Sequence, residues 1–168
     1  MIGDVKQASP PAPQRYVVAR ADEIPQGERL IVEVGGRKVG IFNVGGEYHA
    51  ILYLCPHAGG PLCEGQLVED VFADRPGEIQ HDPARQFIAC PWHGWIFDLK
   101  SGQSWSDPSR VRARRFAVQL EQGSEIRREI DKAAEAPAGL VPGPYVVDKF
   151  PVVVEQDYIV LIMRARGS

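Results

Sequence analysis

Two short segments of this 168-residue chain each place a cysteine beside a histidine within a loop rich in proline and glycine. The first holds Cys55 and His57, and the second holds Cys90 and His93. Thiolates and imidazoles are both metal ligands, while proline and glycine hold a loop in a tight turn before any ligand arrives. The fold must therefore bring the two loops together around one metal centre, which constrains it more than any other feature of the sequence.

The ligand types favour an iron–sulfur cluster. Soft, charged thiolates suit iron that is bridged by sulfide, so we expect Cys55 and Cys90 to hold one iron of a [2Fe–2S] cluster. His57 and His93 then hold the other iron, and this split places the reduction potential at roughly −150 to +300 mV. Two cysteines with two histidines are also a zinc ligand set, so a zinc-stabilised binding module without redox activity is the alternative.

In their proline and glycine context, the two motifs resemble those of the Rieske [2Fe–2S] proteins, and within that family the soluble ferredoxins and oxygenase domains. The resemblance covers the chain from Tyr16 onward, except for the segment between the motifs and a charged helix. It implies one Rieske-type cluster on the four residues already named. Pro142-Gly143-Pro144 resembles the proline loop that covers the cluster in this family.

Short β-branched runs separated by glycine pairs predict successive hairpins, because glycine supplies the positive φ of tight turns. The expected strands cover residues 31–34, 39–44, 48–54, 116–120, 152–154 and 158–163. One helix is expected over residues 124–136, with Ser124 as its cap and Pro137 ending it. We therefore predict an all-β protein, a Rieske-type antiparallel β-sandwich with a small cluster-binding subdomain at about residues 50–100 and one short surface helix.

Residues 1–15 are rich in proline and are expected to form a flexible leader before a single domain over 16–168. Between His57 and Cys90 lie 32 residues, more than the family usually shows. Turns predicted at 75–77 and 81–83 place the surplus at residues 70–85, as an extra hairpin or loop.

The composition limits the partners and the cellular compartment that we expect. The formal net charge of −3 gives no reason to expect binding to nucleic acid or to an anionic membrane. No apolar run approaches the ~20 residues of a membrane span, and the N-terminus lacks the pattern of a secretory signal. With three cysteines, two of them assigned to the metal, we expect a reducing, cytoplasmic compartment.

Histidine is too scarce for an oxygenase within this chain. A mononuclear oxygenase iron needs two histidines and a carboxylate, but only His49 and His81 remain, and no histidine follows His93. We therefore expect no catalytic residues and no enzyme, but one-electron transfer. The resemblance implies a ferredoxin that carries electrons from a flavin-dependent NAD(P)H reductase to a terminal oxygenase. The small subunit of a larger redox enzyme, such as the nitrite reductase type, is the second interpretation.

High-potential family members carry a serine and a tyrosine just after the second histidine, where this chain has Trp95 and Phe97. Fewer hydroxyl donors stabilise the reduced cluster less, so we expect a potential at the low end of the Rieske range. Those members also pair the two loops by a disulfide, but here Trp92 stands where the partner of Cys63 would be. Cys63 is therefore expected to be a packed or partly exposed thiol, and Trp92, Trp95 and Phe97 are expected to cover the iron.

Overall fold

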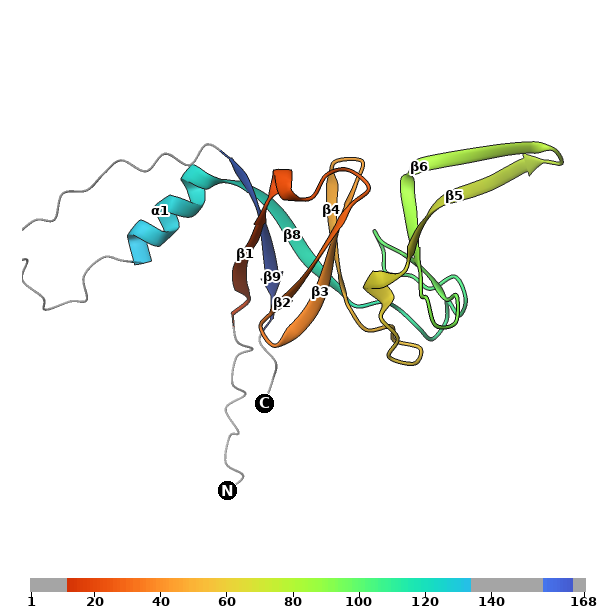
Figure 1. Cartoon of the computed structure of the whole chain (residues 1–168), viewed down its shortest axis with the longest axis horizontal. Coiled ribbons are helices and arrows are strands. Elements are labelled where there is room, and N and C mark those ends of the chain that lie inside the picture. The colour runs from red at the N-terminus through yellow and green to blue at the C-terminus, as the bar shows by residue number, and fades with distance from the viewer. Residues whose placement is uncertain (1–11, 134–155, 165–168) are drawn as a thin grey trace, which may run out of the picture.

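The structure, a computed structural model, describes residues 12–133 and 156–164. These residues form nine strands, one α-helix and two short 3-10 helices (Figure 1). The strands are β1 (Gln14–Arg20), β2 (Arg29–Val34), β3 (Arg37–Val44), β4 (Glu47–Leu52), β5 (Gln66–Arg75), β6 (Glu78–Ala89), β7 (Ile96–Asp98), β8 (Arg115–Gln122) and β9 (Asp157–Met163). The helices are η1 (Ala21–Glu23), η2 (Leu62–Glu64) and α1 (Gly123–Ala133). The prediction of an all-β chain with one short helix is confirmed.

Six strands make one antiparallel sheet in the order β1-β9-β8-β4-β3-β2. The predicted hairpins β2–β3 and β3–β4 turn at Gly35-Gly36 and at Gly45-Gly46, and all four glycines have positive φ. A side chain in that conformation would be strained, which is why a glycine pair marks each turn.

Strand β3 is buried on both faces and lies between two apolar cores. Val39 and Ile41 point into the core of the six-stranded sheet, which also contains Ile159 and Leu161 of β9. Phe42, on the alternate face, belongs to a second core that extends under the ligand loops. Successive strand residues face opposite sides, so a continuous apolar run is what a strand between two cores requires.

The second sheet, β5-β6-β7, contains the surplus residues between the two motifs. The predicted turn at Pro76-Gly77 is confirmed and joins β5 to β6 in a long hairpin. The turn predicted at 81–83 is wrong, because these residues lie within β6. There the pairing jumps from Glu69↔Gln86 to Asp70↔Asp82, which leaves residues 83–85 as a bulge. Pro83 has no N–H to donate, and a bulge tolerates that.

The remaining boundaries differ slightly from the predictions. β1 begins at Gln14, so the last two residues of the expected leader lie in a strand. Helix α1 begins at Gly123, which puts Ser124 inside its first turn and not at the cap. The strand expected at 152–154 and the end of the helix beyond Ala133 lie outside the described residues. No helix within the described ranges is long and apolar enough to span a membrane.

Candidate metal centre

The two loops that carry the cysteine–histidine pairs share one pattern of backbone hydrogen bonds. In the first, the N–H of Cys55 donates to the carbonyl of Gly60 at 2.8 Å, and the N–H of Gly59 donates to the carbonyl of Cys55 at 2.8 Å. The second loop repeats both bonds at the same spacing from Cys90, at 2.8 and 2.9 Å. Gly94, like Gly59, has a positive φ. The two loops are therefore the same turn built twice, although their histidines occupy different positions.

Each cysteine is fixed where its loop leaves a strand and is buried in the second core. Cys90 follows β6 directly, and the first loop is closed by an isolated bridge between Leu54 and Pro61. The two thiols are only 2% and 3% exposed. Burial raises the pKa of the Cys55 thiol, the N–H of His57 lowers it, and the neighbouring Cys90 thiol raises it again. The two sulfur atoms therefore lie side by side inside the protein.

The two histidines lie side by side at the surface. Both are exposed, and the ring centroids of His57 and His93 are 5.0 Å apart, with the rings at 84°. Trp95 stacks on His57 with a centroid distance of 4.0 Å and an interplanar angle of 10°. Such stacking restricts the rotation of an otherwise exposed imidazole, so this ring is held in place before any metal binds.

The donors thus form an inner pair of thiols and an outer pair of imidazoles. A zinc ion needs its four ligands at one point, with metal–ligand distances of about 2.0 to 2.3 Å. Among the residues that the structure describes, no three histidine, cysteine, aspartate or glutamate side chains converge in that way. A binuclear cluster needs one pair of ligands at each end, so this donor set fits [2Fe–2S].

A third loop, residues 104–111, lies against the second ligand loop. The N–H of Trp105 donates to the carbonyl of Ile96 at 2.9 Å, and the N–H of Ile96 donates to Ser106 Oγ at 3.2 Å. Its Pro108 accepts a hydrogen bond from the side chain of Gln103 at 2.8 Å. The residues expected to cover the cluster, 142–144, lie outside the described residues. The sequence reasoning missed Pro108, which lies within 15 residues of His93.

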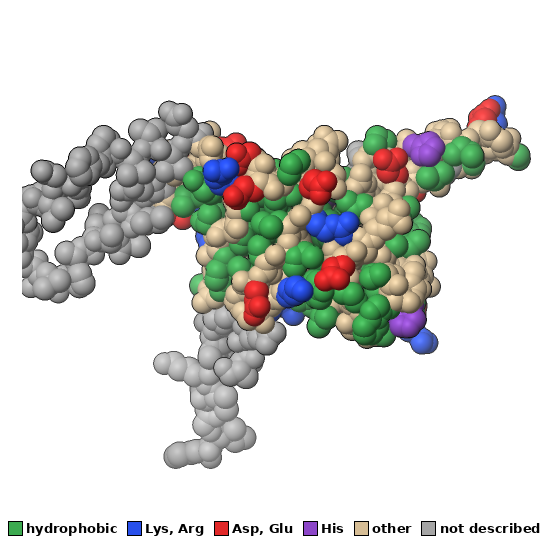
Figure 2. All heavy atoms as spheres, viewed as in Figure 1, with side chains coloured by type: hydrophobic (Ala, Val, Ile, Leu, Met, Phe, Trp, Pro, Cys, Tyr) green, Lys and Arg blue, Asp and Glu red, His purple; other side chains and the backbone are tan. Residues whose placement is uncertain are grey.

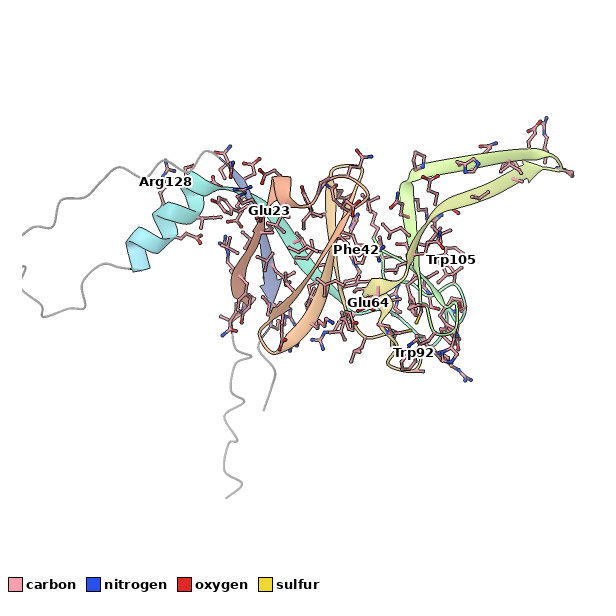
Figure 3. The ribbon with its side chains drawn as sticks, in the orientation of Figure 1. Glu23, Phe42, Glu64, Trp92, Trp105 and Arg128 are labelled. Atoms are coloured by element: carbon pink, nitrogen blue, oxygen red, sulfur yellow. The ribbon has the colours of Figure 1, made fainter. Side chains whose placement is uncertain are left out.

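The sequence also predicted roles for the aromatic residues of the second motif and for Cys63. Phe97 is fully buried and Trp95 is half-buried, whereas Trp92 is 59% exposed and lies against Gly60 of the first ligand loop, with its ring 6.3 Å from that of His93 (Figure 3). Cys63 is the packed thiol that was predicted: it has no exposed surface, and its Sγ lies 3.7 Å from the carbonyl of Leu52.

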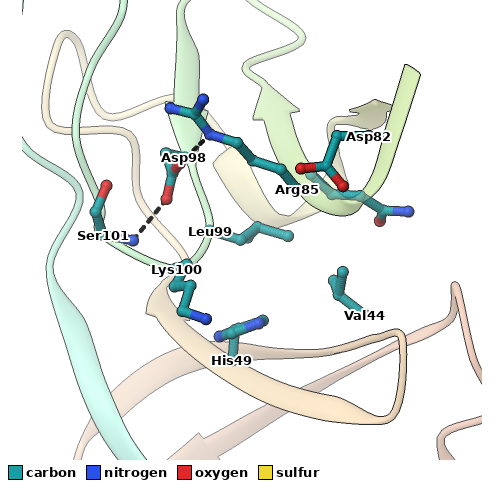
Figure 4. A pocket seen from close by; sticks show the side chains of 9 residues that line it. Val44, His49, Asp82, Arg85, Asp98, Leu99, Lys100 and Ser101 are labelled. Carbon is teal, nitrogen blue, oxygen red and sulfur yellow. Dashed lines mark hydrogen bonds and ion pairs between the residues drawn. The ribbon is translucent and has the colours of Figure 1, made fainter. Parts of the chain in front are cut away.

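His49 and His81 contribute nothing to the ligand loops. His49 is buried at the edge of a separate hollow of about 400 Å³, which Figure 4 shows. Burial lowers its pKa, and nearby Glu47 partly opposes this effect. Across the hollow, Asp98 accepts hydrogen bonds from the N–H of Ser101 at 2.6 Å and from Arg85 at 3.4 Å. These polar groups hold the loop after β7 in place.

Comparisons with known proteins agree with this geometry. The family model for the Rieske [2Fe-2S] domain matches residues 14–119, well over half of the chain. Apoptosis-inducing factor 3 of Homo sapiens is 30% identical over 115 residues, which make up 67% of this chain and 16% of that protein. The 3-phenylpropionate/cinnamic acid dioxygenase ferredoxin subunit of Shigella boydii serotype 4 (strain Sb227) is 29% identical over 111 residues, 66% of this chain and 89% of the subunit.

One solved structure resembles the fold over nearly the whole chain. It is described as the small subunit of an NADH-dependent nitrite reductase from Mycobacterium tuberculosis, with a TM-score of 0.56. The alignment covers 92% of this chain and 98% of that one at 16% identity, so the likeness concerns the fold alone. By contrast, the chain spans only 16% of the length of Apoptosis-inducing factor 3. Both ligand loops lie inside the region that matches the family model.

Proposed function

Since the chain belongs to the Rieske [2Fe-2S] domain family, we propose that it is a ferredoxin that carries single electrons from a reductase to a terminal oxygenase. The observation that supports this most directly is the arrangement of the two loops, with buried thiols and surface imidazoles. When bound, the cluster supplies the one-electron chemistry. Cys55 and Cys90 would hold its inner iron, and His57 and His93 its outer iron.

The protein's own residues define where an electron enters and leaves. The exposed His57 and His93 are the shortest path between the interior of this site and a docked partner. Two aromatic side chains would limit the access of water to the histidine end of the site. Phe97 is fully buried, and Trp95 stacks on His57. The preformed loops would hold the ligands in one geometry, as an electron-transfer site requires.

The proposal places no oxygenase chemistry within this chain. A mononuclear iron needs two histidines and a carboxylate on one side of a cavity. His49 lies in β4 and His81 in the β5–β6 hairpin, and in the described part of the chain no three histidine, cysteine, aspartate or glutamate side chains converge on a metal site. The partners in this proposal are a flavin-dependent NAD(P)H reductase and a terminal oxygenase, by analogy with the dioxygenase ferredoxin subunit that the chain resembles.

Absorption and EPR spectra before and after dithionite test the proposal. A red-brown protein with two irons per chain, whose reduced form gives a rhombic signal with an average g below the free-electron value, is the expected result. A colourless protein that keeps stoichiometric zinc after iron–sulfur reconstitution would exclude a carrier. A permanent stoichiometric partner on purification would instead assign the chain to a larger redox enzyme.

The same proposal includes a midpoint potential at the low end of the range of roughly −150 to +300 mV. Phe97 has no hydroxyl to donate toward the cluster sulfurs, and Phe97→Tyr would supply one. We expect this variant to have a higher midpoint potential than the wild type in protein-film voltammetry, whereas Phe87→Tyr, on β6, serves as the control and leaves it unchanged. A wild-type midpoint well above zero would contradict the proposal.

A further inference from the structure

The β5–β6 hairpin extends beyond the rest of the described chain. From the bulge at 83–85 onward, the two strands pair with each other from Asp70↔Asp82 to Arg75↔Glu78 and extend away as an arm, residues 70–82 (Figure 1). Its outward-facing apolar side chains include Val71, 55% exposed, and Ile79, 68% exposed. An arm that buries so little apolar surface adds little to the stability of the fold, so its role lies elsewhere.

An apolar groove of about 320 Å³ lies at the base of this arm. It is lined mainly by apolar side chains of three strands and of the third loop: Val68, Val71, Phe87, Ile96 and Trp105. Trp105 is 55% exposed and lies between the arm and Trp92 in Figure 3.

Arg85 lies beside the groove and contacts two of its aromatic side chains. Its guanidinium lies 5.3 Å from the ring centroids of both Phe87 and Trp105, and it forms an ion pair with Asp70 at 2.9 Å. Trp105 is thus fixed by a cation–π contact and by its backbone bond to Ile96. A large aromatic side chain that is exposed yet held in place is typical of a binding hot spot.

The charge around the groove is mostly negative, which favours a positively charged partner. Residues 69–85 contain five carboxylates, Glu69, Asp70, Asp74, Glu78 and Asp82, against two arginines, Arg75 and Arg85, the second of which pairs with Asp70. Figure 2 shows acidic side chains near the base of the arm and at its tip, where a basic side chain lies beside them. Like charges repel, so this surface disfavours a second copy of itself, a nucleic acid and an anionic membrane.

We propose that the arm and groove form a docking surface for a protein partner that presents an extended, lysine- or arginine-rich segment with an apolar side chain. The apolar side chain enters the groove beside Trp105, while the basic residues face the carboxylates of the arm. Ile96, which lines the groove, follows Trp95, the residue stacked on His57. A docked partner therefore sits next to the second ligand loop. That this partner exchanges electrons rests on the proposed function, whereas the binding itself does not.

Fluorescence anisotropy of two labelled peptides on the oxidised, cluster-loaded protein tests the proposal. In one peptide lysine and valine alternate, and in the other glutamate replaces lysine. We expect the lysine peptide to bind about tenfold more tightly at low salt, and this preference to disappear at high salt. Trp105→Ala weakens its binding about tenfold, and Asp74→Asn/Glu78→Gln about three- to tenfold.

Glu33→Gln/Glu125→Gln is the matched control, since it removes two exposed carboxylates that lie outside the arm. It leaves the affinity unchanged. Equal binding of the lysine peptide to the wild type, to Trp105→Ala and to Asp74→Asn/Glu78→Gln would overturn the proposal. So would arm-dependent dimerisation in sedimentation, which would place a second copy in the groove. No electron transfer is measured, so a protein that fails as a carrier can still bind the peptide, and a working carrier can fail to bind it.

Discussion

The six-stranded sheet and the ligand subdomain around Cys55 and Cys90 are stabilised in different ways. The sheet has long hydrogen-bonded ladders and a core of aliphatic and aromatic side chains from six strands. The ligand subdomain has one strand of only three residues, several turns, and a core in which both ligand thiols are packed. We therefore expect the first region to fold on its own contacts and the second to be completed by the cluster.

Strand β3 connects these two regions, because its alternate faces belong to different cores. Val39 and Ile41 support the sheet, while Phe42 and Val44 support the ligand loops. Substitutions on one face of β3 should therefore destabilise one region more than the other. They test whether the sheet is stable without the cluster while the ligand subdomain depends on it.

Removal of a cluster ligand should produce the largest difference between the two regions. We expect Cys90→Ser to lose the cluster, with iron falling from two per chain to nearly none, because a thiolate ligand of the inner iron is gone. Hydrogen exchange should then accelerate in β6 and β7 but remain slow in β3, β8 and β9. Cys63→Ala is the control and keeps its iron. Uniform unfolding of Cys90→Ser would show that the sheet also depends on the cluster.

Replacement of one buried phenylalanine in each core should give the next largest difference between the two regions. Phe42 is fully buried under the ligand loops, and Phe116 is 8% exposed in the sheet core. Each change to alanine should lower the free energy of unfolding by about 3–5 kcal/mol in urea titrations. Only Phe42→Ala should also speed the loss of iron to a chelator under native conditions. Equal rates of iron loss in the two variants would mean that the cores are not separate.

The same contrast explains what could be predicted from sequence. Hairpins with glycine pairs are local patterns, and the prediction of both hairpins is confirmed. The two cysteine–histidine motifs are local as well, and they indicate the family that the comparison shows. The bulge at 83–85 depends on register with β5, and the stacking of Trp95 on His57 depends on how two loops meet. Neither is encoded in neighbouring residues. The third loop with Pro108 was missed for the same reason, since only tertiary hydrogen bonds place it beside the second motif.

Gly40 tests how tightly the two regions are packed together. A Cβ atom there would lie 2.5 Å from Cys63 Sγ and 2.8 Å from its Cβ. Cys63 cannot move aside easily, because it is fully buried against the carbonyls of Ile51 and Leu52. Gly40→Ala should therefore cost about 1–3 kcal/mol of unfolding free energy and accelerate iron loss.

Gly45→Ala is the matched control for this prediction. Open space surrounds its Cβ position, but its φ of +61° makes any side chain unfavourable. It should lower the unfolding free energy by about 1 kcal/mol without changing the rate of iron loss. If Gly40→Ala left both quantities at their wild-type values, the contact between β3 and η2 would be looser than the structure shows.

A further effect concerns the proton on Cys63. Burial raises the pKa of this thiol to about 12, so the folded chain keeps a proton that the unfolded chain releases above about pH 8.5. The stability that this provides is complete below that pH and falls by about 1.4 kcal/mol per pH unit as the pH rises toward the folded-state pKa. Urea unfolding at about pH 8 and about pH 10 should show the wild type losing stability relative to Cys63→Ala by roughly this slope. Parallel losses in the two proteins would show that the thiol is accessible, and that the boundary between sheet and ligand subdomain admits solvent.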